Sequence, residues 1–89
     1  MTNSTETLLE FPCAFPLKVF GHNADDFEAF VAAIARRHIP QFEQADVNSR
    51  PSHGGKYLAV TITFIAESRE QLDALYQDMS ASARILMLL

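Results

Sequence analysis

Three histidines and one cysteine carry the side chains best suited to catalysis or metal binding, and they are scattered along the chain. His22, His38 and His53 fall in three separate segments, and neither of the first two has a second ligand at helical spacing on one face. Cys13 lies on an extended arm between two prolines, without a neighbouring cation or a helix start that could stabilise an oxyanion. No nucleophile with an adjacent base, carboxylate pair or metal cluster emerges, so we expect no enzyme, metal or cofactor.

The loop that begins at Gly21 is the first candidate ligand site. Gly21 would let backbone N–H groups approach a carboxylate at the positive start of a helix, with His22 and Asn23 in the same loop. The simpler interpretation is a tight strand-to-helix turn in which Asn23 caps the helix and Asp25 and Asp26 occupy its positive field. The sequence leaves both interpretations open.

A second candidate is the locally basic loop formed by Arg50, His53 and Lys56 around Gly54 and Gly55. Its cations could hold a phosphate or carboxylate, which makes Arg50 and Lys56 candidate ligand residues. A turn between two strands explains the two glycines equally well without a ligand.

These sites depend on strands that the apolar pattern predicts. Alternating apolar residues predict strands at 15–21 and 56–66, and the latter is rich in β-branched and aromatic residues. The polar segment 42–49, broken off by Pro51, predicts an edge strand. The segment 83–89 is apolar at nearly every position, which predicts a final strand covered on both faces.

Two amphipathic helices alternate with these strands. The first has apolar residues at helical spacing from Phe27 and ends near His38, and the second begins at a capping box from Ser68 to Gln71 and ends near Ser80. The resulting order β-α-β-β-α-β places both helices on one face of a four-stranded antiparallel sheet. We therefore predict a ferredoxin-like α+β sandwich.

The face of the sheet opposite the helices is the third candidate surface. Leu58, Val60, Ile62 and Phe64 should face the helices. Alternation then assigns the following residues to the open face: Lys18, Phe20, Tyr57, Thr61, Thr63, Ile65, Leu86 and Leu88. This set is more apolar than contact with water requires, so we expect a cover: an N-terminal arm with Leu8, Leu9 and Phe11, a second copy, or a partner.

Length and charge restrict the classes of function. Eighty-nine residues allow one domain, which we place at 15–89 after an arm at 1–14. A net charge of −4, with no basic face expected, disfavours nucleic acid as a partner. Neither a signal peptide nor a membrane span is evident, so we expect a cytoplasmic protein.

Motifs spread along the chain resemble those of the YbeD family of small bacterial proteins. They are Leu8-Leu9-Glu10-Phe11-Pro12, Phe15, Lys18-Val19, Gly21, Arg50-Pro51-Ser52, Gly55, Tyr57 and Met87-Leu88-Leu89. The resemblance implies a ferredoxin-like fold similar to ACT-type regulatory domains, in which a glycine-containing loop holds amino-acid effectors at a dimer interface. For the family itself it implies a regulatory role near lipoate metabolism and no catalytic residues.

Together these observations predict a non-catalytic regulatory or adaptor module. It would bind a small metabolite or a protein partner and couple that binding to oligomerisation, with a homodimer as one assembly. The alternatives are an interaction domain without a small ligand and a binder of single-stranded RNA. The RNA alternative is weaker, because only Phe20 and Tyr57 could stack bases and Ala59 replaces a further aromatic.

Overall fold

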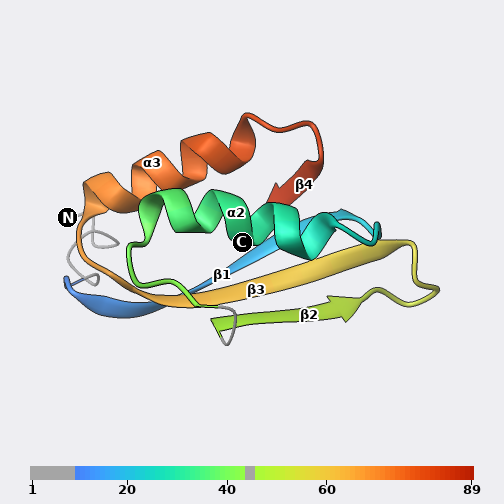
Figure 1. The fold of residues 1–89 in the computed structure, drawn as a ribbon, viewed down its shortest axis with the longest axis horizontal. Coiled ribbons are helices and arrows are strands. Elements are labelled where there is room, and N and C mark those ends of the chain that lie inside the picture. The colour runs from blue at the N-terminus through green and yellow to red at the C-terminus, as the bar shows by residue number, and fades with distance from the viewer. Residues whose placement is uncertain (1–9, 44–45) are drawn as a thin grey trace, which may run out of the picture.

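In the computed structural model, the described residues are 10–43 and 46–89, and they form one sheet and two helices. The elements are β1 (Cys13–His22), α2 (Phe27–His38), β2 (Val47–Pro51), β3 (Tyr57–Ala66), α3 (Arg69–Ser80) and β4 (Ile85–Leu88). The four strands are antiparallel neighbours in the order β2-β3-β1-β4, and both helices lie on one face of the sheet (Figure 1). The predicted ferredoxin-like α+β fold is confirmed.

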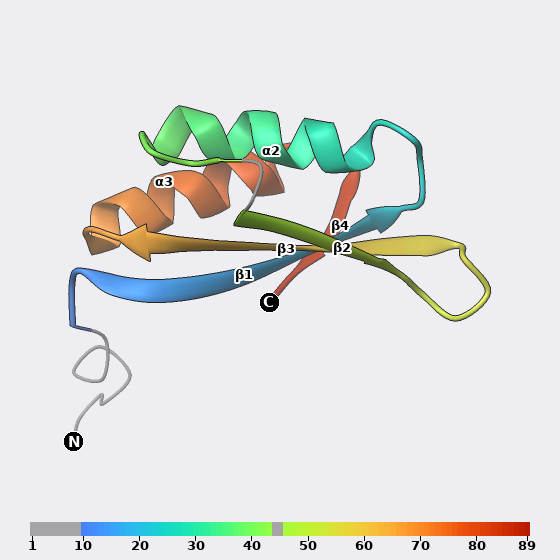
Figure 2. The same cartoon turned by 60° about the horizontal axis from the view of Figure 1, so that its bottom comes forward.

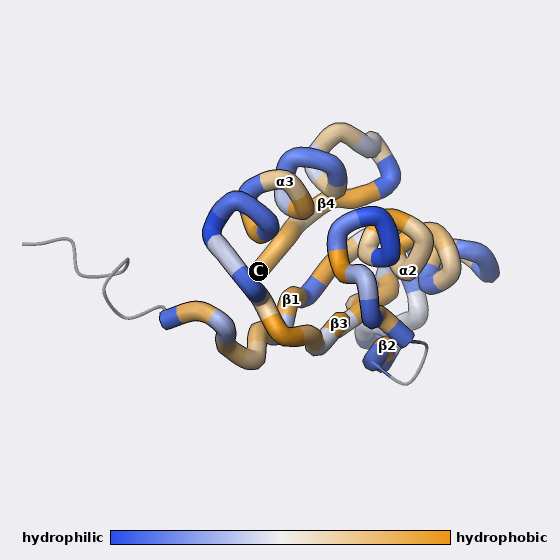
Figure 3. Tube along the Cα trace, turned by 60° about the vertical axis from the view of Figure 1, so that its left-hand side comes forward, coloured by the Kyte–Doolittle hydropathy of each residue, from blue (hydrophilic) through white to orange (hydrophobic). Residues whose placement is uncertain are grey.

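The long β1–β3 ladder forms the centre of the sheet. It pairs Cys13 with Ala66 at one end and His22 with Tyr57 at the other, without a break. Side chains that face the helices are buried, including Leu17, Val19 and the predicted set Leu58, Val60, Ile62 and Phe64 of β3. Figure 3 shows hydrophobic residues along β1, β3 and β4, and a hydrophilic β2 at the edge of the sheet. Alternation along β3 was thus predicted correctly.

The two helix starts differ in how they are capped. Ser68 caps α3, because its Oγ accepts the Gln71 backbone N–H at 3.1 Å, as the capping box predicted. The expectation that Asn23 caps α2 is wrong. Its backbone N–H donates to the Lys56 carbonyl at 3.0 Å and its Nδ2 to the Gly55 carbonyl at 2.9 Å, which extends strand pairing past the end of β1. Asp26 takes the N-cap position without a side-chain cap bond.

The edge strand β2 begins later than predicted. It starts at Val47 and includes Pro51 as its last residue, whereas Phe42 is buried in the core. A turn after α2 causes this difference, since the Phe42 N–H donates to the Ile39 carbonyl at 3.1 Å and folds Phe42 inward.

Two predictions about the opposite edge strand, β4, are wrong. Met87 pairs with Phe20 but Ile85 pairs with Gly21, so Leu86 is an extra residue that shifts the alternation. Leu88 consequently pairs with Val19 and faces the helices, not the open face. Nor is β4 covered on both faces, because the side chains of Leu86 and Met87 are about half exposed.

The N-terminal segment does not lie on the open face where the structure describes it. Cys13 and Ala14 belong to β1, so this strand begins two residues earlier than predicted, and Phe11 packs against the core. Leu8 and Leu9 lie outside the described residues. In Figure 2 no described helix or strand covers the sheet face opposite the helices. Within 10–43 and 46–89, neither helix is long and apolar enough to cross a membrane.

Candidate functional site

A hollow on the open face of the sheet is the candidate site. Its volume is about 550 Å³, and the residues that line it are Lys18, Asn48, Ser49, Arg50, Pro51, Ala59 and Thr61. They come from the three neighbouring strands β1, β2 and β3, so strand pairing holds the floor of the hollow rigid. We call this feature the Lys18–Arg50 hollow.

Strand register explains why these residues converge. Thr61 of β3 pairs with Lys18 on one side and Asn48 on the other, and Ala59 pairs with Arg50. Neighbouring strands lie about 4.8 Å apart, so the long Lys18 and Arg50 side chains flank β3 within reach of a common ligand. The small side chain of Ala59 leaves the space between them open.

The charged side chains at the strand positions of the open face have one sign, whereas Asp46, just before β2, lies with Thr63 and Ile65 at the other end of the face. Its strand positions carry Lys18 and Arg50 but no carboxylate side chain. By alternation these positions are Ala14, Pro16, Lys18, Phe20, His22, Asn48, Arg50, Tyr57, Ala59, Thr61, Thr63, Ile65, Met87 and Leu89. In the described part of the chain, no carboxylate forms an ion pair with Lys18 or Arg50. The lining of the hollow is therefore basic, although the whole chain carries a net charge of −4.

Other basic side chains have structural partners on the helix side. Arg37 and His38 at the end of α2 bind Asp78 of α3 at 3.0 and 2.8 Å. The hydrogen bond with His38, with further help from Arg37, lowers the pKa of the Asp78 carboxyl. These contacts tie the two helices together, and the sequence offered no signal for them because the partners lie about forty residues apart.

Arg84, just before β4, is held in the same way. It binds Asp26 at the start of α2 at 2.7 Å, and its guanidinium lies over the Phe30 ring at 4.6 Å from the ring centroid. The bidentate hydrogen bonding lowers the pKa of Asp26 and raises that of Arg84. Arg84 is therefore engaged in linking the final strand to the first helix.

The Gly21 loop and the glycine turn, predicted as separate candidates, meet at one end of the sheet. The His22 and Tyr57 rings lie 5.3 Å apart, Lys56 Nζ lies 5.6 Å from the Tyr57 ring centroid, and Asn23 binds Gly55. Gly21 itself is buried, and a Cβ there would lie 2.4 Å from the Phe27 ring. Close packing thus explains Gly21 without a ligand.

Only some of the remaining open-face candidates lie at or near the hollow. Thr61 lines it, Phe20 lies beside Ala59, and Thr63 lies one pleat further along β3. Leu86 lies apart, on the β4 edge, and Leu88 faces the helices. The sequence thus grouped Arg50 with Lys56 in one candidate site, whereas in the structure Arg50 and Lys18 line the same hollow.

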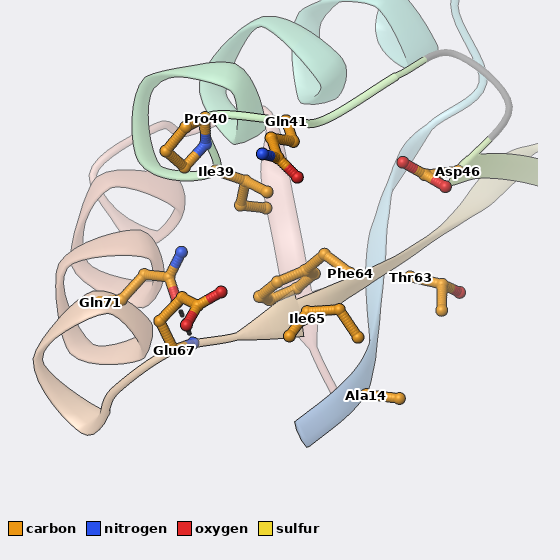
Figure 4. A pocket seen from close by; sticks show the side chains of 10 residues that line it. All are labelled: Ala14, Ile39, Pro40, Gln41, Asp46, Thr63, Phe64, Ile65, Glu67 and Gln71. Atoms are coloured by element: carbon orange, nitrogen blue, oxygen red, sulfur yellow. Dashed lines mark hydrogen bonds between the residues drawn. The ribbon is translucent and has the colours of Figure 1, made fainter. Parts of the chain in front are cut away.

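A second pocket, of about 500 Å³, lies at the opposite end of β3 (Figure 4). Its apolar part includes Ile39, Phe64 and Ile65. The Gln71 amide there already donates to the His38 carbonyl and accepts the Glu67 N–H, at 2.8 and 2.7 Å. With Asp46 and Glu67 as its charged groups, this pocket is unsuited to an anion.

Across the described ranges, no three His, Cys, Asp or Glu residues group as metal ligands. The fold and site define a small two-layer ferredoxin-like domain with a hollow lined by two basic residues on its open sheet face. The solution structure of HP0495 from Helicobacter pylori has this fold, with a TM-score of 0.67 at 12% identity, and the match covers 91% of this chain and 85% of that one.

The chain belongs to the family described as "Protein of unknown function (DUF493)", whose pattern matches residues 6–89. Its relatives include a UPF0250 protein of Chromobacterium violaceum, 38% identical over 89 residues with both chains fully covered. A UPF0250 protein of Leptothrix cholodnii is 43% identical over 84 residues, which cover 94% of this chain and 92% of that one. The resemblance to the YbeD family is thereby confirmed.

Proposed function

We propose that this domain is a non-catalytic regulatory module that binds a small anionic metabolite in the Lys18–Arg50 hollow. The observation that carries the proposal is the pair of cations without ion-pair partners in the described chain, set in a hollow whose lining contains no carboxylate side chain. A carboxylate or phosphate group is the ligand chemistry that such a pair recognises.

Neutral side chains add directional contacts around the two charges. Asn48 carries amide donors and Thr61 carries a hydroxyl, and both line the hollow between the cations. An oxyanion lying over Ala59 would thus meet charged groups on two sides and neutral donors beside them. Regulation follows if the ligand binds one arrangement of the protein better than another and shifts the population toward it.

NMR chemical-shift mapping tests the proposal. We expect inorganic phosphate or succinate to shift the backbone amides of Lys18, Asn48, Arg50 and Thr61, with saturation at millimolar concentration. The shifts should shrink as sodium chloride is added, because salt screens exposed charges. Shifts confined to residues 21–26 would instead support the Gly21 loop, and no saturable shift at all would contradict the proposal.

The same experiment separates a small ligand from RNA. An oligouridylate that bound much more tightly than phosphate, with shifts at Phe20 and Tyr57, would support base stacking on the open face. The structure disfavours this arrangement, because the Tyr57 ring already lies against His22 and Ala59 presents no ring. We expect the affinity for the oligonucleotide to be no higher than the charge of its phosphates explains.

A further inference from the structure

On the other exposed edges of the sheet, a proline removes one of the outward N–H donors that another strand could pair with. On β2, the Ser52 N–H donates to the Tyr57 carbonyl, so Pro51, one residue earlier, points outward and offers no N–H. On β1, residues before Lys18 extend beyond β4, and Pro16 there removes the donor on the uncovered side. Proline at such positions prevents edge-to-edge association.

The β4 edge has neither of these protections. Residues 85–89 contain no proline and no charged side chain. Leu89 exchanges both backbone hydrogen bonds with Lys18, at 3.0 and 2.9 Å, so the N–H and C=O of Leu88 point away from the sheet. An outward donor and acceptor on an apolar strand form a template for another strand.

Exposed apolar side chains are concentrated at the same edge. Five large apolar residues of the described chain are exposed, and three of them are Leu86, Met87 and Leu89, at 50%, 52% and 65%. Met87 and Leu89 project on the open face, since they stand opposite Phe20 and Lys18. Pairing of this edge would therefore bury apolar surface in addition to forming hydrogen bonds.

We propose that β4 pairs antiparallel with β4 of a second copy of this chain, joining the two sheets about a two-fold axis. A two-fold axis presents the same edge to itself, so the outward N–H of Leu88 in each chain meets the outward C=O of Leu88 in the other. Met87 then lies opposite Leu89 of the second copy, apolar against apolar. Residues 85–89 have no charged side chain that pairing would have to desolvate.

The contact is short, so the dimer is expected to exchange with monomer at accessible concentrations. Only four residues form β4, and the bulge at Leu86 interrupts its regular pairing. This inference does not depend on an anion in the hollow. It can therefore be tested in buffer free of phosphate and carboxylates, which separates its outcome from that of the proposed function.

Sedimentation equilibrium of the full chain, from micromolar to millimolar concentration, tests the pairing. We expect the mass to rise from one chain to two, and Met87→Lys to raise the dissociation constant at least about tenfold by placing a charge on each strand. Ile65→Lys is the matched control, because Ile65 is also 52% exposed on the open face but lies at the other end of the sheet, opposite Ala14. It should leave dimerisation unchanged.

Hydrogen exchange of the wild-type chain gives a second measurement, which does not depend on introducing a charge. The Leu88 amide should exchange more slowly as protein concentration rises, because in the dimer its N–H donates to the Leu88 carbonyl of the second copy. A wild-type chain that remains monomeric at millimolar concentration would overturn the proposal. Equal weakening by Met87→Lys and Ile65→Lys would also overturn it, since the contact would then lie across the whole open face.

Discussion

Replacing Gly21 with alanine should destabilise the fold by steric overlap. The new Cβ would lie 2.4 Å from the Phe27 ring and 2.6 Å from the Arg84 carbonyl oxygen. Phe27 is fully buried, and the nearby atom of Arg84 belongs to the backbone, so neither neighbour can easily move aside. Overpacking of this kind costs about 1–3 kcal/mol of unfolding free energy, and two such overlaps place Gly21→Ala near 3 kcal/mol. For a domain of this size that is a fall of roughly 12–24 °C in melting temperature.

Gly54→Ala is the control for this prediction. Gly54 has a φ of +87°, and nothing lies within 4 Å of the position its Cβ would take. Its replacement should cost only the backbone strain, about 1 kcal/mol. Thermal and urea unfolding of both variants measure the difference. A Gly21→Ala chain within about 0.5 kcal/mol of wild type would refute the packing explanation, and lost phosphate binding without lost stability would instead indicate a ligand at the Gly21 loop.

Two further substitutions test contacts on the helix side. Ser68→Ala removes the cap of α3 and should cost about 1 kcal/mol, or roughly 4–8 °C in melting temperature; an unchanged melting temperature would contradict the capping role. Asp78→Asn should lower the melting temperature at neutral pH by weakening the bonds to Arg37 and His38. Because the folded pKa of Asp78 is lowered, its carboxylate contributes stability above the ordinary pKa of 3.8 that is lost as pH falls through the lowered value. The gap between wild type and Asp78→Asn should therefore close in acid, and a gap that widened there would contradict this explanation.

Much of the fold was predictable from local patterns. Alternation along 56–66 identified the faces of β3, and the Ser68 box identified the start of α3. The errors arose where distant segments decide local structure. The bulge at Leu86 reflects its pairing with β1, and Asn23 binds the turn at Gly55 instead of its own helix.

The candidate site was predictable only in part, for the same reason. Arg50 and Lys18 were both singled out from the sequence, but as members of different surfaces. Their proximity depends on the registers of β1 and β2 against β3, which set Lys18 opposite Thr61 and Arg50 opposite Ala59. A single sequence does not specify how three strands align, and Ala59 therefore appeared only as a missing aromatic residue.

The most direct test of the account is phosphate affinity in a charge-matched pair of variants. One carries Lys18→Gln with Arg50→Gln, and the other carries Arg36→Gln with Arg69→Gln, which removes two exposed cations from the helices instead. Both lose the same net charge, so long-range attraction changes equally. We predict that NMR titration will show affinity falling at least about tenfold in the first variant and staying near wild type in the second. Equal affinity in the two variants would contradict the claim that the Lys18–Arg50 hollow is the anion site.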